Sequence, residues 1–136
     1  GRGEGGAPLQ ATTSHALPWQ CAAPSAVPFA EGWDTPQALD EAGIDRLVEA
    51  YVDAARRAVR LGFDVIELHC AHGYLLHQFQ SPLSNRRTDA WGVDQAGRDR
   101  LALRIAQRLR SPAPTFAGVA AAYSARSFLC FSGSFE

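Results

Sequence analysis

The sequence predicts an α/β fold, because an amphipathic helix, a short apolar strand and a second amphipathic helix follow one another along the chain. The first helix is expected from about residue 41 or 44 to residue 60, and the strand Phe63–Leu68 follows after a break at Gly62. The second helix is expected over about 96–110. A helix that leads directly into a strand is half of a repeating α/β unit.

Length and composition are those of one globular domain. The chain has 136 residues, of which 46% are hydrophobic and 20% charged, and its formal net charge is −1. That charge argues against a general nucleic-acid surface, which needs a basic excess. No run of about 18 apolar residues occurs, so no membrane-spanning helix is expected. Cys21, Cys70 and Cys130 are widely spaced, which predicts neither a disulfide framework nor a zinc site and favours a reduced, cytoplasmic setting.

Three segments follow from the composition along the chain. Residues 1–18 are rich in Gly, Ala, Thr and Ser without periodicity, and are expected to form a loop or disordered lead-in. Residues 19–110 carry the predicted elements, and 111–136 form a divergent tail whose apolar run at 116–123 is rich in alanine. The first residues contain neither an initiator methionine nor a signal-peptide core, so we expect an interior cut there.

Periodicity and end signals define the first helix. Asp40 or Asp45 suits its positive end, and Gly62 is the stop signal. Upstream, we expect the proline-interrupted segment 19–29 to be anchored against a larger body by Trp19, Val27 and Phe29. One apolar stripe recurs at spacings of three and four, formed by Ile44, Leu47, Val48, Tyr51, Ala55, Ala58 and Val59.

The strand is followed at once by proton-transferring side chains. Its apolar, β-branched run suits a strand buried on both faces. His69, His72 and Tyr74 come directly after it, where a strand ends and a loop begins. In parallel α/β architectures this edge carries the chemistry, because the loops that leave the C-terminal ends of the strands share one face.

The remainder of the central segment contains a short helix, a loop and the second long helix. A helical turn is expected over 73–79 and a polar loop over 86–92. Five arginines between 98 and 110 could indicate nucleic-acid binding, but a solvated helix face, partly paired with Asp94 and Asp99, explains them better.

Other interpretations of the same residues stay open at this point. His69 alone could be a core histidine, and Tyr74 alone could serve packing. His77 is expected to be structural, and Cys70 to be a small buried side chain. A metal site built from the histidines has no carboxylate or cysteine ligands at matching spacing, so we expect no metal.

The string GFDVIELHCAHGYLLHQFQSPLSNRRTD at 62–89 resembles the old yellow enzyme family of FMN-dependent NAD(P)H:flavin oxidoreductases. The pieces APSAVPF at 23–29 and TPQAL at 35–39 resemble the same family at its usual distances. The resemblance covers about residues 19–110 and weakens after Gly92. It implies that 19–110 is part of a flavin-oxidoreductase barrel.

The resemblance implies a partial TIM (β/α)8 barrel with only a few βα units, and an ene-reductase that uses FMN and NAD(P)H on a small-molecule substrate such as an enone. His69 and His72 match the family pair that holds the substrate carbonyl, and Tyr74 matches the catalytic proton donor. Arg86 and Arg87 are expected to position the loop through salt bridges rather than to contact flavin. The full-length family suggests a homo-oligomer.

The chain also departs from the family pattern. Val93 stands where the family has a second glycine, and Gly97 where it has an asparagine. The strand expected after residue 110 carries no arginine for the flavin, and the main FMN-binding segments are missing, so the cofactor-binding residues stay unknown. A closed barrel takes roughly 250 residues. The alternative is therefore a catalytically inactive, truncated remnant of such an enzyme.

Overall fold

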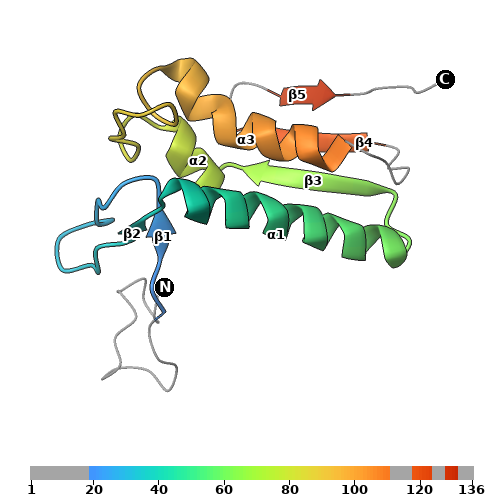
Figure 1. Ribbon diagram of the computed structural model, residues 1–136, viewed down its shortest axis with the longest axis horizontal. Helices are drawn as coiled ribbons and strands as arrows, with labels where there is room; N and C mark the ends of the chain where they lie inside the picture. The colour runs from blue at the N-terminus through green and yellow to red at the C-terminus, as the bar shows by residue number, and fades with distance from the viewer. Residues whose placement is uncertain (1–18, 111–117, 124–127, 132–136) are drawn as a thin grey trace.

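The computed structural model describes residues 19–110, 118–123 and 128–131, in which a small sheet carries two long helices on one side (Figure 1). The lead-in predicted for residues 1–18 lies outside the described residues. The elements in chain order are β1 (Ala22–Ala23), β2 (Gln37–Ala38), α1 (Glu41–Arg60), β3 (Val65–Cys70), α2 (Leu75–Gln80), α3 (Gln95–Arg110), β4 (Gly118–Tyr123) and β5 (Phe128–Phe131).

The sheet joins β3 to a strand from the tail. β3 and β4 are parallel, from Val65 opposite Gly118 to Cys70 opposite Tyr123. With α3 between them, they form a β-α-β unit. The sequence alone indicates a divergent tail over 111–136, because its alanine-rich run does not by itself identify a strand that pairs with β3. β5 then pairs antiparallel with β4, so the described sheet has the order β3-β4-β5 and does not continue as a purely parallel sheet.

The two predicted long helices are confirmed, and local signals define their ends. The Asp40 carboxylate accepts a hydrogen bond from the Gly43 N–H at 2.6 Å and so caps α1. At the other end Gly62 has φ +83° and its N–H donates to the Val59 carbonyl, while the Phe63 N–H donates to Ala58. This is a Schellman ending, which needs a left-handed residue and therefore favours glycine.

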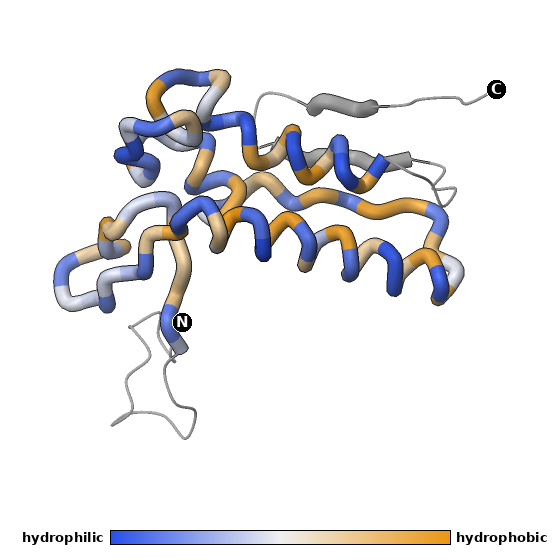
Figure 2. Tube along the Cα trace, viewed as in Figure 1, coloured by the Kyte–Doolittle hydropathy of each residue, from blue (hydrophilic) through white to orange (hydrophobic). Residues whose placement is uncertain are grey.

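The core lies between the helices and one face of β3. α1 alternates between hydrophobic and hydrophilic positions, whereas β3 is largely hydrophobic (Figure 2). Burying such side chains contributes about 1.5–3 kcal/mol each, which makes this layer the main source of stability. The buried side chains of the cluster are Ile44, Val48, Val52, Ala55, Leu68, Cys70, Leu76, Phe79, Trp91, Leu101, Ala102, Ile105 and Leu109.

β3 corrects the sequence prediction in two respects. It spans Val65–Cys70 rather than Phe63–Leu68, so His69 belongs to the strand itself. It is also not buried on both faces, because Val65 is 57% exposed while Leu68 is 2% exposed. Alternate side chains of a strand point to opposite faces. The helices cover one face only, and the apolar run at 65–68 does not reveal that difference.

Two arginines of α3 pair with acidic side chains of α1 rather than with the predicted partners Asp94 and Asp99. Arg104 pairs with Asp45 of α1 at 2.7 Å, and Arg108 pairs with Glu49 of α1. Asp94 caps α3 through the Gly97 N–H at 2.7 Å. The predicted partners lie at the start of the same helix, whereas packing against α1 brings other carboxylates close to these two arginines. No helix of the described residues is long and apolar enough to cross a membrane.

The segment before α1 is anchored differently from the prediction. Trp19, Val27 and Phe29 are exposed, and the segment is held instead by the buried Ala23 and Pro24. β1 and β2 form a two-residue parallel ladder. Small residues pack this segment against the core, and a search for large apolar side chains in the sequence does not identify them.

Replacing Leu101, which is fully buried on α3, tests the position of the core. Leu101→Ala is expected to lower the free energy of unfolding by about 2–5 kcal/mol, because it leaves a cavity in the buried cluster. Leu103→Ala on the exposed side of the same helix is the matched control and should change it by less than about 1 kcal/mol. Urea titration followed by circular dichroism measures both, and equal losses would contradict this placement of the core.

Candidate active site at the C-terminal end of β3

Polar side chains gather at the end of β3 where the strand gives way to α2. The same end of the structure carries α2, the loop 81–94 and the β1–β2 ladder (Figure 1). α2 also contacts both β1 and β3. Segments from three parts of the chain therefore meet at the edge that the sequence predicts for the chemistry.

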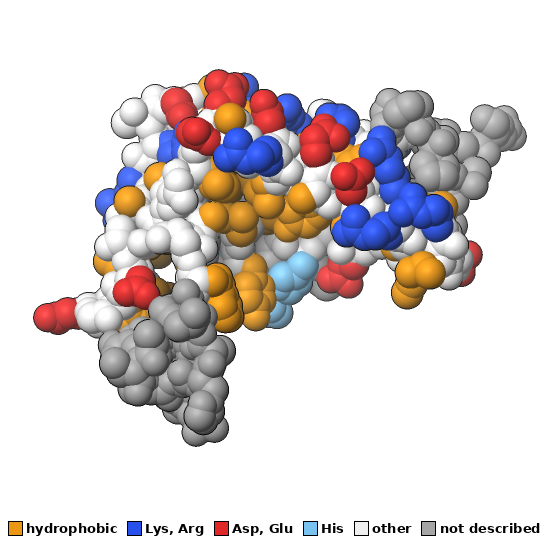
Figure 3. Space-filling model, turned by 60° about the horizontal axis from the view of Figure 1, so that its bottom comes forward, with side chains coloured by type: hydrophobic (Ala, Val, Ile, Leu, Met, Phe, Trp, Pro, Cys, Tyr) orange, Lys and Arg blue, Asp and Glu red, His pale blue; other side chains and the backbone are white. Residues whose placement is uncertain are grey.

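His69 lies on the open face of β3. Val65, Glu67 and His69 are exposed, and the side chains between them point into the core. Histidine side chains lie at the surface in Figure 3, next to apolar side chains. The imidazole of His69 is thus held on a regular strand and faces away from α1 and α3.

A tight turn carries the next two groups. His72 has φ +57° and Gly73 has φ +74°, so two successive residues take the left-handed conformation. This conformation is uncommon for a residue with a side chain and costs free energy unless its surroundings hold it. The Tyr74 N–H donates to the Ala71 carbonyl at 3.2 Å and closes the turn, and Tyr74 is the N-cap residue of α2.

The structure brings the three predicted site residues together. The ring centroids of His69 and His72 are 5.2 Å apart, and those of His69 and Tyr74 are 5.4 Å apart. All three side chains are exposed, with Tyr74 at 64%. Two imidazoles and one phenol therefore present N–H and O–H groups to the same small region of the surface.

His77 and Cys70 stand apart from this cluster. His77 is half-buried on α2, and its Nδ1 accepts a hydrogen bond from the Gly73 N–H at 2.8 Å. Cys70 lies in the core, where burial raises the pKa of its thiol to about 11. Within the described ranges, no group of three histidine, cysteine or acidic side chains is placed to hold a metal ion.

The loop after α2 is held by a buried asparagine that the sequence analysis did not single out. Asn85 is 4% exposed, and its Nδ2 donates to the carbonyls of Phe79 and Trp91 at 2.7 and 2.9 Å. A Cβ on Gly92 would come within 2.6 Å of the Asn85 side chain, which explains glycine there. The run Ser-Pro-Leu-Ser-Asn predicts a break but does not reveal that its last residue is buried.

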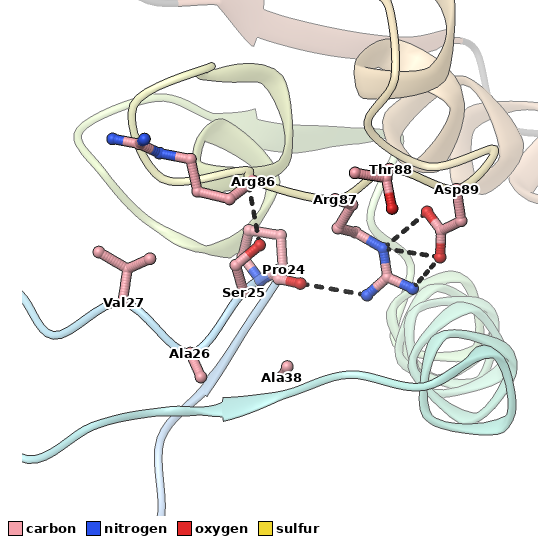
Figure 4. Close-up of a pocket in the computed structure, with 9 residues that line it drawn as sticks. All are labelled: Pro24, Ser25, Ala26, Val27, Ala38, Arg86, Arg87, Thr88 and Asp89. Atoms are coloured by element: carbon pink, nitrogen blue, oxygen red, sulfur yellow. Dashed lines mark hydrogen bonds and ion pairs between the residues drawn. The ribbon is translucent and has the colours of Figure 1, made fainter.

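Arg87 joins three segments of the chain (Figure 4). Its Nη1 donates to the carbonyl of Pro24 at 3.1 Å and to that of Leu39, and its guanidinium pairs with Asp89. The prediction that Arg87 positions the loop is confirmed. Arg86 holds the loop by hydrogen bonds rather than by a salt bridge to an acidic side chain of the described residues: its backbone N–H donates to Ser25 Oγ at 2.9 Å, and its Nε donates to the Leu83 carbonyl at 3.0 Å.

An open pocket of about 470 Å³ lies beside Arg87. Its walls come from the β1 segment and from the loop 86–89, and the Arg87–Asp89 pair occupies one side (Figure 4). Both charges of that pair already have partners, so the pocket offers no free charge there. The three rings at the end of β3 do not line it.

Changing Arg87 tests whether it joins these segments. Arg87→Met should lower the free energy of unfolding by about 2–3 kcal/mol, since it removes charge-assisted hydrogen bonds to two backbone carbonyls. Arg86→Met is the matched control and is expected to cost less than about 1 kcal/mol, because Arg86 is exposed. Thermal and urea unfolding measure both variants, and an Arg87 variant as stable as its control would contradict the assignment.

The Arg87–Asp89 pair also predicts a pH dependence. The hydrogen bond from Arg87 lowers the pKa of the Asp89 carboxyl, partly offset by burial. A lowered folded-state pKa stabilises the fold above the ordinary carboxyl range, and this contribution is lost as the pH falls through the lowered pKa. Asp89→Asn should therefore flatten the acid limb of a plot of urea midpoint against pH, whereas Asp34→Asn, at an exposed carboxyl, should leave it unchanged.

Comparisons with known proteins give the family of the chain. The model of the NADH:flavin oxidoreductase / NADH oxidase family matches residues 4–118. An NADPH dehydrogenase of Geobacillus thermodenitrificans is 49% identical over 94 residues, which are 65% of this chain and 28% of that protein. An NADH:flavin oxidoreductase of Gibberella zeae is 41% identical over 115 residues, 84% of this chain and 28% of that protein.

Solved structures agree with the sequence relatives. Morphinone reductase has a TM-score of 0.66 at 36% identity, over 74% of this chain and 31% of that one. The old yellow enzyme homologue from Zymomonas mobilis has a TM-score of 0.63 at 34% identity, over 67% of this chain and 28% of that one. The chain spans less than a third of the length of these relatives. The match over most of its residues shows that the chain belongs to the NADH:flavin oxidoreductase / NADH oxidase family.

Proposed function

We propose that the end of β3 is the substrate side of an FMN-dependent oxidoreductase site that reduces an activated alkene, such as an enone, with NAD(P)H as the source of electrons. The observation that carries this proposal is the cluster of His69, His72 and Tyr74 on an open surface, in which the His69 ring lies 5.2 Å from the ring of His72 and 5.4 Å from that of Tyr74. Membership of the family supports the flavin and the nicotinamide nucleotide.

The fold supports the proposal that these elements are a segment of a (β/α)8 barrel. β3 and β4 are parallel with α3 between them, and the helices cover one face of β3 only. In such a barrel the second face of each strand points to the interior, and the active site lies at the C-terminal ends of the strands. The exposed Val65, Glu67 and His69 would then face the barrel interior.

The residues present fit one side of a flavin site. Three donor side chains on an open face suit a flat ring system and a carbonyl substrate, and FMN supplies the hydride when it is bound. No basic side chain of the described residues lies within the cluster to balance the phosphate of FMN. The donor set therefore accounts for substrate binding and proton transfer and leaves phosphate binding to other parts of a barrel.

The two imidazoles stabilise charge on the substrate. Addition of hydride to the β-carbon of an enone moves an electron pair onto the carbonyl oxygen and produces an enolate. N–H donors on His69 and His72, aimed at that oxygen, lower the barrier because their interaction strengthens as the charge develops. A strand and an adjoining tight turn hold these donors, so little reorganisation is needed.

Tyr74 completes the reduction. The α-carbon of the enolate takes up a proton, and a phenol can provide it because it is protonated at neutral pH. Its place at the start of α2, 5.4 Å from the His69 ring, allows one substrate to reach both groups. The proton goes from the Tyr74 hydroxyl to carbon, and solvent returns it to the exposed phenolate.

A chimera tests this proposal independently of how the chain behaves alone. The matched segment of this chain replaces its counterpart in the Geobacillus thermodenitrificans NADPH dehydrogenase, and turnover of NADPH with an enone is measured. We expect the chimera to bind FMN and to reduce the enone. Tyr74→Phe should lower enone reduction by about 100-fold or more, whereas NADPH consumption with dioxygen should persist.

Two controls accompany the chimera. Tyr51→Phe, on α1 and outside the cluster, should leave enone reduction unchanged. The 136-residue chain is also assayed alone with excess FMN, NADPH and an enone. If this sample is colourless and inactive while the chimera is active, the chain is a remnant without activity of its own. A chimera that binds FMN but reduces enones equally well with His69, His72 or Tyr74 replaced would overturn the proposed roles.

A further inference from the structure

We propose that His77 is a positioning residue of this site. Its imidazole carries its proton on Nε2, so that Nδ1 can accept a hydrogen bond from the Gly73 N–H. This hydrogen bond fixes the turn that carries His72 and Tyr74. The inference rests on the proposed function for its catalytic meaning. Its structural part stands on the hydrogen bonds of the turn alone.

The turn needs an external support. His72 and Gly73 both have positive φ, and for a non-glycine residue such as His72 this costs of order 1–3 kcal/mol. Gly73 has no side chain to help, and a Cβ there would meet nothing within 4 Å. The glycine is needed for its backbone conformation and not for space, so something else must select this conformation.

Two consecutive side chains of α2 supply the support. The Gly73 N–H donates to His77 Nδ1 at 2.8 Å, and the Gly73 carbonyl accepts from Gln78 Nε2 at 2.7 Å. The N–H and the carbonyl of Gly73, which belong to the two peptide groups on either side of this residue, are therefore both bound by side chains of the helix that follows. This defines the peptide orientation between the two left-handed residues.

The arrangement resembles a capping box moved by one residue. In a capping box a Glu or Gln at the third helical position reaches back to the N–H of the N-cap residue. Here the N-cap is Tyr74, whose side chain makes no capping hydrogen bond. His77 occupies the third helical position and reaches one residue further back, to Gly73. The Tyr74 side chain takes no part in capping the helix.

The hydrogen bond determines the chemical form of His77. An N–H donor needs a lone pair on Nδ1, so the imidazole must be neutral with its proton on Nε2. Such a ring cannot donate from Nδ1. This separates His77 from His69 and His72, whose proposed role is to donate to a substrate oxygen, and it assigns different tasks to three histidines within nine residues.

The tautomer can be measured in the 136-residue chain without any substitution. Long-range proton–nitrogen spectra of the histidine rings distinguish a protonated Nε2 from a protonated Nδ1. We expect His77 to show an unprotonated Nδ1 at neutral pH and a coupling or shift change that links it to the Gly73 amide. A protonated Nδ1 in His77 would overturn the inference.

Two variants at one position then test the acceptor. His77→Phe keeps a ring but has no acceptor, and should speed hydrogen exchange of the Gly73 amide by about fivefold, as expected for the loss of one hydrogen bond. His77→Asn places an oxygen at the position of Nδ1 and should restore the exchange rate to within about twofold of the parent. Equal exchange in the two variants would contradict the assignment.

The catalytic part is measured in the chimera described above. His77→Phe should lower kcat for enone reduction by about tenfold, with the rate of NADPH consumption by dioxygen unchanged, and His77→Asn should recover most of the loss. A loss of kcat without recovery in His77→Asn would refute positioning through the acceptor. Absence of enone reduction in every chimera would refute the proposed function, while the tautomer and exchange measurements would still decide the place of His77 in the turn.

Discussion

The structure depends on β3 having two unlike faces. One face, with Leu68 and Cys70, packs under α1 and α3, and the other carries Val65, Glu67 and His69 to the surface. Because side chains alternate along a strand, burying the first set orients the second without further contacts. The hydrophobic layer therefore positions His69, and the polar edge derives its rigidity from packing that lies on the opposite side.

Local signals made much of the fold predictable. Asp40 and Gly62 mark the ends of α1 through short-range hydrogen bonds, and such bonds depend only on neighbouring residues. The ends of β3 were harder to predict from the sequence. Its last two residues are extended because they pair with β4, about fifty residues further along the chain, and that partner cannot be read from the apolar run itself.

The sequence allowed the three side chains of the candidate site to be singled out, but not the contacts that support them. The order His-x-x-His-x-Tyr after a strand indicated the three groups, and the structure places their rings together. The contacts that hold the turn and the neighbouring loop involve backbone carbonyls and amides, which residue types do not distinguish. The hydrogen bond from Arg87 to the carbonyl of Pro24, 63 positions away, cannot be predicted from the pattern of residue types, and neither can the tautomer of His77.

Cys70 adds a consequence for chemistry at this edge. Its neighbour in sequence, His69, points to the surface, yet the sulfur lies in the core with a pKa of about 11. At neutral pH nearly all of this sulfur is in the thiol form, which is a poor nucleophile. Under the proposed function, an electrophilic alkene bound against the imidazoles would meet this sulfur as a buried thiol, the form that reacts slowly with electrophiles.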